Sequence, residues 1–188
     1  MDQFTQNPGA HATGRHGGGA WTGTSPWEVG EGPMTAGTID KNRLMFPGLA
    51  GLYESLAPYS YAIIRFAAGA LVIYHGYMKL FGGFAGPVAQ NVLTPLGFPA
   101  PLAWAYFLGV LEFFGGALLA LGLFTRPLAL AFAIQFAVIT YWHSANGYFF
   151  TSPRGGWEFP ALMTVIYLAI FFRGGGRCSL DKSVGKEL

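Results

Sequence analysis

The stretch LAWAYFLGVLEFFGGALLALGLF, residues 102–124, decides the fold. Its 23 residues are apolar or small except for one carboxylate, Glu112, near the middle. At about 1.5 Å per residue this length spans a hydrocarbon core of about 30 Å, so the stretch is predicted to be a transmembrane helix. A carboxylate at that depth is costly in lipid, so Glu112 is expected to face protein and to have a partner.

The composition agrees with a membrane protein. Of the 188 residues 52% are hydrophobic and only 11% are charged, with a mean hydropathy of +0.39. Soluble domains carry about a quarter charged residues. The net charge of +2 comes from dispersed basic residues, which argues against nucleic acid as a partner. The single cysteine, Cys178, cannot form an internal redox pair.

Three further spans are predicted around the central one, at residues 59–81, 128–148 and 158–172. The predicted fold is therefore an all-α membrane protein, a four-transmembrane-helix bundle over residues 59–173. Residues 45–58 are broken by two prolines and suit a segment lying at the interface, and residues 174–188 form a C-terminal tail. Between the first two spans, residues 82–101 hold four prolines and are expected to be an outer loop or a half-inserted segment.

The N-terminal tail, residues 1–44, is polar and rich in glycine. It is expected to be inert and disordered by itself, or ordered by a partner that it contacts through Trp21 and Trp27. Its two histidines, His11 and His16, are isolated in the sequence, so no metal site is assigned to them.

The orientation follows from the short flanks of the spans. One side collects six basic residues and the other side only two, and the positive-inside rule places the richer side in the cytoplasm. A multi-pass protein of the cell inner (cytoplasmic) membrane with both termini cytoplasmic is expected. The six residues are Lys41, Arg43, Arg126, Arg173, Arg177 and Lys182.

One face of the first span carries both charges and glycines. At 100° per residue, Arg65, Gly69, Val72, Gly76 and Lys79 lie within one narrow stripe. Small residues beside polar ones are typical of a helix-packing face in membranes, so this stripe is predicted to point into the bundle.

The helix rise suggests a partner for Glu112. Arg65 lies about 9 Å from the cytoplasmic boundary and Glu112 about 15 Å from the outer one, so their depths differ by two turns at most. Arg65 is therefore predicted to pair with Glu112, with Gln135 of the third span at a similar depth. Two interpretations stay open: the pair is a neutralised link that fixes helix register, or it belongs to a functional site.

A second polar group is expected near the outer boundary. His75 and Lys79 end the first span, His143 ends the third beside Trp142, and Glu158 begins the fourth. Such residues can simply snorkel, cap a helix or form an interfacial belt. Alternatively, they line a polar pocket that binds a carbonyl ligand such as a quinone head group.

Several short motifs resemble the DoxX family in its order. They are Arg65, HGYMKL at 75–80, EFFGGALLALGLFTR at 112–126, His143, WE at 157–158 and GGGRCSLD at 174–181. The resemblance covers about residues 57–182. It implies a four-helix membrane protein that works beside a quinone-linked redox enzyme, because the family takes its name from subunits associated with a terminal quinol oxidase and with thiosulfate:quinone oxidoreductase.

Two functions follow as expectations. The first is a membrane subunit of a quinone-linked oxidoreductase or respiratory complex, with other redox subunits and membrane lipid as partners. The second is a non-catalytic accessory subunit that uses its N-terminal tail as a strap over a larger complex. No CxxC, bis-haem histidine pair or glycine-rich nucleotide loop is found, so no cofactor is expected to be bound by this chain alone. A solute carrier is least favoured, since no inverted repeat is seen.

Overall fold

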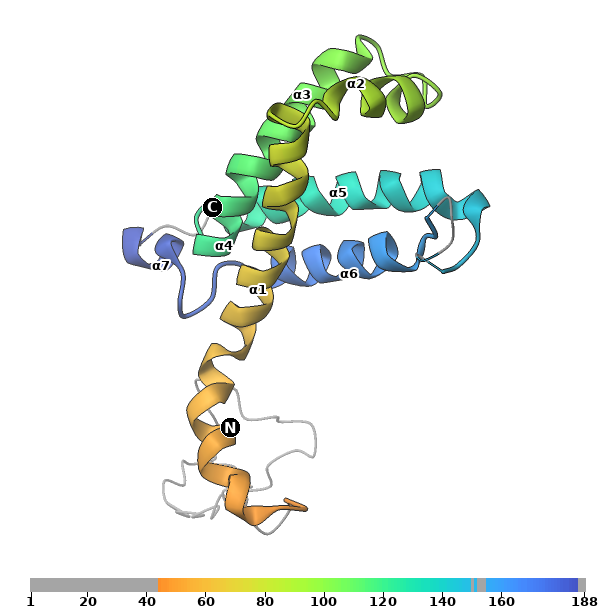
Figure 1. Ribbon diagram of the computed structural model, residues 1–188. Coiled ribbons are helices and arrows are strands. Elements are labelled where there is room, and N and C mark those ends of the chain that lie inside the picture. Colours follow the sequence, from red (N-terminus) through yellow and green to blue (C-terminus); the bar gives the residue numbers. More distant parts are fainter. Residues whose placement is uncertain (1–43, 150, 152–154, 186–188) are drawn as a thin grey trace, which may run out of the picture. The chain divides into compact units, whose positions relative to one another are not determined.

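The computed structural model describes residues 44–149, 151 and 155–185, and within them it contains helices and no strands (Figure 1). The predicted anchors of the tail, Trp21 and Trp27, lie outside the described residues. The main helices are α1 (Ala50–Leu80), α3 (Pro101–Val110), α4 (Gly116–Leu121), α5 (Thr125–His143) and α6 (Glu158–Arg173). The shorter ones are η2 (Pro47–Leu49), α2 (Ala85–Val88), η3 (Ala89–Leu93), η4 (Leu111–Gly115), η5 (Ser144–Asn146) and α7 (Leu180–Val184).

Three segments are long and apolar enough to cross a membrane: Pro47–Leu80, Pro101–Leu121 and Thr125–Asn146. The part of the chain that the structure describes therefore has the all-helical architecture of a multi-pass membrane protein. The fourth predicted span corresponds to α6, which has 16 residues. The first span is longer than predicted, because α1 begins at Ala50 and continues through Pro58, so that much of the predicted interfacial segment belongs to this helix.

Glycines bring α1 against α3 and α4. A Cβ atom added to Gly69 would lie 2.5 Å from the carbonyl oxygen of Gly116, and one added to Gly76 would lie 2.8 Å from that of Gly109. Two backbones can approach this closely only where side chains are missing. The glycine stripe read from the sequence is thus confirmed as the packing face, and it fixes an antiparallel register between α1 and the central span.

The helices α5 and α6 form a second pair and lie along each other (Figure 1). Their core is aromatic: the ring of Tyr167 lies 5.1 Å from that of Phe132 and 5.3 Å from that of Phe136. The Tyr167 hydroxyl donates a hydrogen bond of 2.8 Å to the carbonyl oxygen of Ala68 on α1. Buried residues of α1, α4, α5 and α6 share one apolar cluster, so the two pairs are joined around a common core.

The proline-rich segment after α1 folds into α2 and η3 and packs on α3. Ala85, Ala89 and Leu93 are buried against Ala105 of α3, and Phe98 packs against the same cluster. This arrangement places the segment over one side of α3, where its apolar side chains form a wall of the site described next.

Candidate functional site

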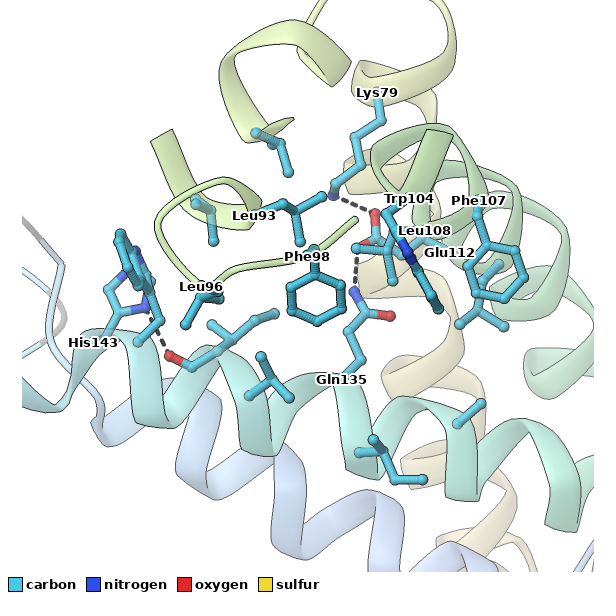
Figure 2. A pocket seen from close by; sticks show the side chains of 18 residues that line it. Lys79, Leu93, Leu96, Phe98, Trp104, Phe107, Leu108, Glu112, Gln135 and His143 are labelled. Carbon is cyan, nitrogen blue, oxygen red and sulfur yellow. Dashed lines mark hydrogen bonds and ion pairs between the residues drawn. The ribbon is translucent and has the colours of Figure 1, made fainter. Parts of the chain in front are cut away.

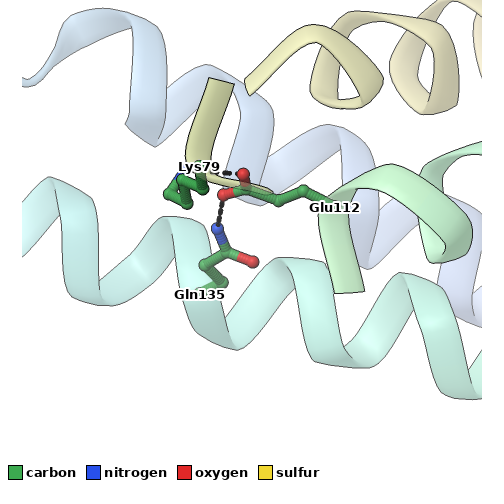
Figure 3. A network of polar contacts seen from close by, with 3 residues as sticks. All are labelled: Lys79, Glu112 and Gln135. Atoms are coloured by element: carbon green, nitrogen blue, oxygen red, sulfur yellow. Dashed lines mark hydrogen bonds and ion pairs between the residues drawn. The ribbon is translucent and has the colours of Figure 1, made fainter. Parts of the chain in front are cut away.

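Glu112 lies at the centre of a buried polar cluster (Figure 3). Its Oε2 atom is 2.6 Å from the ammonium nitrogen of Lys79, and its Oε1 atom accepts a hydrogen bond from the Gln135 amide. The side chains of Lys79 and Glu112 are only 12% and 4% exposed. The carboxylate is thus satisfied by one cation and one amide, from α1 and α5, as a charge removed from water requires.

The local backbone aims these groups at one another. Glu112 lies in η4, a single turn of π-helix inserted between α3 and α4. Such turns recur at functional sites, because the extra residue shifts the direction of a side chain relative to the helix on either side. The Lys79 side chain on α1 passes close to Gly109. A Cβ atom added to Gly109 would lie 3.0 Å from the Cβ atom of Lys79. The missing side chain of Gly109 therefore gives the lysine its path to Glu112.

A cavity of about 520 Å³ adjoins this cluster (Figure 2). Its volume lies in the range typical of small-molecule sites, about 300–1,000 Å³. Lys79, Glu112 and Gln135 form one polar part of its lining, and Trp142 and His143 line it toward the end of α5, while the remaining walls are apolar. The wall residues are Val88, Val92, Leu93, Leu96, Phe98, Trp104, Phe107, Leu108, Leu111, Ala131, Ile134, Val138 and Ile139.

The predicted pairing of Arg65 with Glu112 is wrong. Arg65 is 2% exposed, and its guanidinium donates hydrogen bonds to the backbone carbonyls of Gly175 and, at 2.6 Å, of Cys178. The antiparallel register explains the difference, since Arg65 lies beside Gly122, where an added Cβ would be 2.6 Å from its guanidinium carbon. Gly122 follows Glu112 by ten residues, which is about 15 Å of helix.

The C-terminal segment is instead held by its own polar network. Asp181 is buried, and its two carboxylate oxygens accept hydrogen bonds from the backbone N–H groups of Phe124 and Thr125, at 2.9 and 3.0 Å. Its own N–H donates to the Gly122 carbonyl at 2.9 Å. Together with Arg65, Asp181 ties the segment predicted to be a tail to the turn between α4 and α5.

The predicted outer pocket is only partly assembled. Lys79, Trp142 and His143 line the cavity, but His75 is exposed on α1 and Glu158 begins α6 without lining it. The Nδ1 atom of His143 lies 2.9 Å from the carbonyl oxygen of Ile139. The sequence analysis treated the group around Glu112 and the group near the outer boundary separately. In the structure Glu112 and Gln135 line the same cavity as His143.

Sequence reasoning missed the apolar part of the site. Leu93 and Phe98 come from the segment that was expected to be an outer loop or half-inserted, and Trp104 comes from the lipid-spanning stretch. Their residue types carry no signal of a ligand, because aromatic and aliphatic side chains are ordinary in any membrane helix. These side chains become walls of the cavity because α2, η3, α3 and α5 line the same space.

Comparison with known proteins supplies a family. The DoxX family model matches residues 60–145. An uncharacterized protein of Haemophilus influenzae is 31% identical over 137 residues, an alignment that covers 71% of this chain and 97% of the relative. No solved structure matches the chain.

Proposed function

The chain belongs to the DoxX family of membrane proteins, and on that premise we propose that it is the membrane subunit of a quinone-linked redox or respiratory complex whose cavity receives a quinone head group. The observation that carries the proposal is the cavity itself, whose walls are apolar except for a few polar groups, Lys79, Glu112 and Gln135 among them. A lipid-soluble quinone has the same division, with two polar oxygens on a ring and an apolar substituent.

In this proposal the residues of the site bind and orient the ligand, and they do not store electrons. The apolar walls exclude water from the ring, while the Lys79 ammonium supplies a hydrogen-bond donor in a low-dielectric setting. Electrons would pass between the ligand and a partner subunit. In this proposal the quinone is a substrate shared with that partner.

We further propose that α6 is the fourth span and that both termini are cytoplasmic, in the cell inner membrane. Its 16 residues extend about 24 Å, somewhat less than the hydrocarbon core. Arg173 at its end stacks on the ring of Tyr61, with 4.5 Å between the guanidinium carbon and the ring centroid, and a flanking arginine of this kind helps a short helix to span.

Binding tests the proposal directly. Two tryptophans, Trp104 and Trp142, line the cavity, so a decyl-substituted benzoquinone added to the purified chain in nanodiscs should quench its fluorescence with saturation. Ile139→Phe places a larger side chain in the cavity wall and should weaken the saturable phase. Ile63→Phe, at a residue of α1 that is 59% exposed, is the matched control and should leave it intact. Quenching that rises linearly and equally in all three proteins would mean simple partition into lipid and would refute the site.

The second candidate is the accessory subunit with no redox chemistry of its own. The observation that favours it is the length of residues 1–44, whose Trp21 and Trp27 suit a strap across a larger partner. Deleting residues 1–44 should then disrupt the complex isolated from native membranes while turnover per remaining complex stays unchanged. A complex that assembles normally without these residues would count against this function.

A further inference from the structure

One acceptor in the cavity wall lacks a partner. The Oε1 atom of Gln135 is buried, and among the described residues no group donates a hydrogen bond to it. Gln135 is 8% exposed and lines the cavity beside Glu112 (Figure 2). A buried polar atom without a partner is costly, so such an atom in a cavity wall indicates where a ligand makes a polar contact.

The orientation of the amide is fixed by its neighbour. An ionised carboxylate only accepts hydrogen bonds, and the Oε2 atom of Glu112 lies 2.6 Å from the Lys79 ammonium nitrogen. The Gln135 nitrogen must therefore face Glu112, as it does, and its oxygen must face elsewhere. Turning the amide over would place two acceptors against each other, so the unpaired oxygen is a consequence of the site.

The same part of the cavity also offers a donor. The Lys79 ammonium carries three N–H groups, and one of them serves Glu112. A ligand beside this cluster thus meets an unpaired acceptor at Gln135 and a cationic donor at Lys79, which contact different oxygens of the Glu112 carboxylate. A hydroxyl group can donate a hydrogen bond to the Gln135 oxygen, whereas a carbonyl oxygen only accepts and leaves Gln135 unsatisfied.

We propose that the cavity selects its ligand by a hydroxyl group, so that it binds a quinol, the reduced form, in preference to the quinone. The hydroxyl donates to Gln135 Oε1, while the ring and its substituent lie against the apolar wall. This inference rests on the proposed function and adds the redox form that is bound.

His143 belongs to the far side of the same cavity. It follows Gln135 by eight residues on α5, which is about 12 Å along the helix. The unpaired acceptor lies at Gln135, so the selecting contact is the one with its Oε1 atom. A change at His143 is therefore expected to alter affinity for both redox forms alike.

The test compares three ligands with one decyl tail: a benzoquinol, its oxidised quinone and its dimethyl ether. Their affinities for the full chain in nanodiscs are measured by calorimetry under anaerobic conditions and corrected for partition into empty nanodiscs. The quinol should bind about tenfold more tightly than the quinone, since the quinone leaves a buried acceptor unpaired. The ether, which has no donor, should resemble the quinone.

Variants assign the preference to the amide. Gln135→Met removes the acceptor and should bring quinol and quinone to equal affinity, while Gln90→Met, at an exposed glutamine of η3 that does not line the cavity, should keep the tenfold ratio. Equal affinities in the unmodified chain, or tighter binding of the quinone, would overturn the hydroxyl inference and leave the quinone site standing. Saturable binding of none of the three would overturn the quinone site, and the inference with it. If Gln135→Met does not fold, the ratio of quinol to quinone affinity in the unmodified chain still tests the inference.

Discussion

Replacing Lys79 alone by a neutral residue should destabilise the protein more than replacing Lys79 and Glu112 together. Lys79→Met leaves a carboxylate that is 4% exposed with only the Gln135 amide as partner. Breaking a buried ion pair from one side typically costs 3–5 kcal/mol, and because one hydrogen bond remains we expect about 3 kcal/mol. Glu112→Gln leaves an unpaired ammonium, which is more exposed, and should cost about 2 kcal/mol.

The double variant Lys79→Met with Glu112→Gln contains no unpaired charge and keeps an amide that can accept from Gln135. It should lie within about 1 kcal/mol of the original protein, which gives a coupling of several kcal/mol between the two changes. The assay is the loss of helicity by circular dichroism during titration with SDS. Lys182→Met removes an exposed lysine of α7 and is the control, with an expected change below about 0.5 kcal/mol. Additive effects, or a loss below 1 kcal/mol in Lys79→Met, would refute the buried pair.

Three further predictions concern the scaffold. Gly76→Ala places a Cβ 2.3 Å from a backbone nitrogen of the facing helix and should cost about 1–3 kcal/mol in the same titration, whereas Gly86→Ala has open space and should change little. Asp181→Ala leaves two backbone N–H groups without their acceptor, so trypsin should cut the C-terminal segment faster, and an unchanged rate would contradict its docking. Arg65→Met should destabilise the protein independently of Glu112→Gln, so a coupling above about 0.5 kcal/mol would argue for contact between these residues.

The fold was largely readable from the sequence because apolar length and glycine spacing act locally. A helix of given length either can or cannot span, and Gly69 and Gly76 lie on one face by helical geometry alone. The length of α6 marks the limit of this reasoning. Its 16 residues fall near the minimum for a span, where flanking residues and neighbouring helices decide the outcome.

The cation that pairs with Glu112 was not predicted, because depth was counted separately in each span; Gln135, which was expected at the depth of Glu112, does contact it. That count assumes that both helices begin at the membrane boundaries, whereas α1 begins at Ala50 and a π-turn interrupts the central span at Glu112. The spacing of the glycines would have indicated the correct cation. Pairing the glycine stripe of α1 in antiparallel order with Gly109 and Gly116 would have placed Arg65 near Gly122 and left Lys79 as the cation within reach.

Arg65 and Lys79, both on α1, therefore serve different ends of the molecule. Arg65 contacts backbone carbonyls of the C-terminal segment, a role that needs several donors in a fixed geometry and no change of state. Lys79 contacts a carboxylate in a cavity wall, where its remaining donors face space that a ligand can fill. About 21 Å of helix separates them, and each is held by its own partners. A ligand entering the cavity can thus exchange hydrogen bonds with Lys79 and Gln135 without disturbing the contacts that hold the C-terminal segment in place.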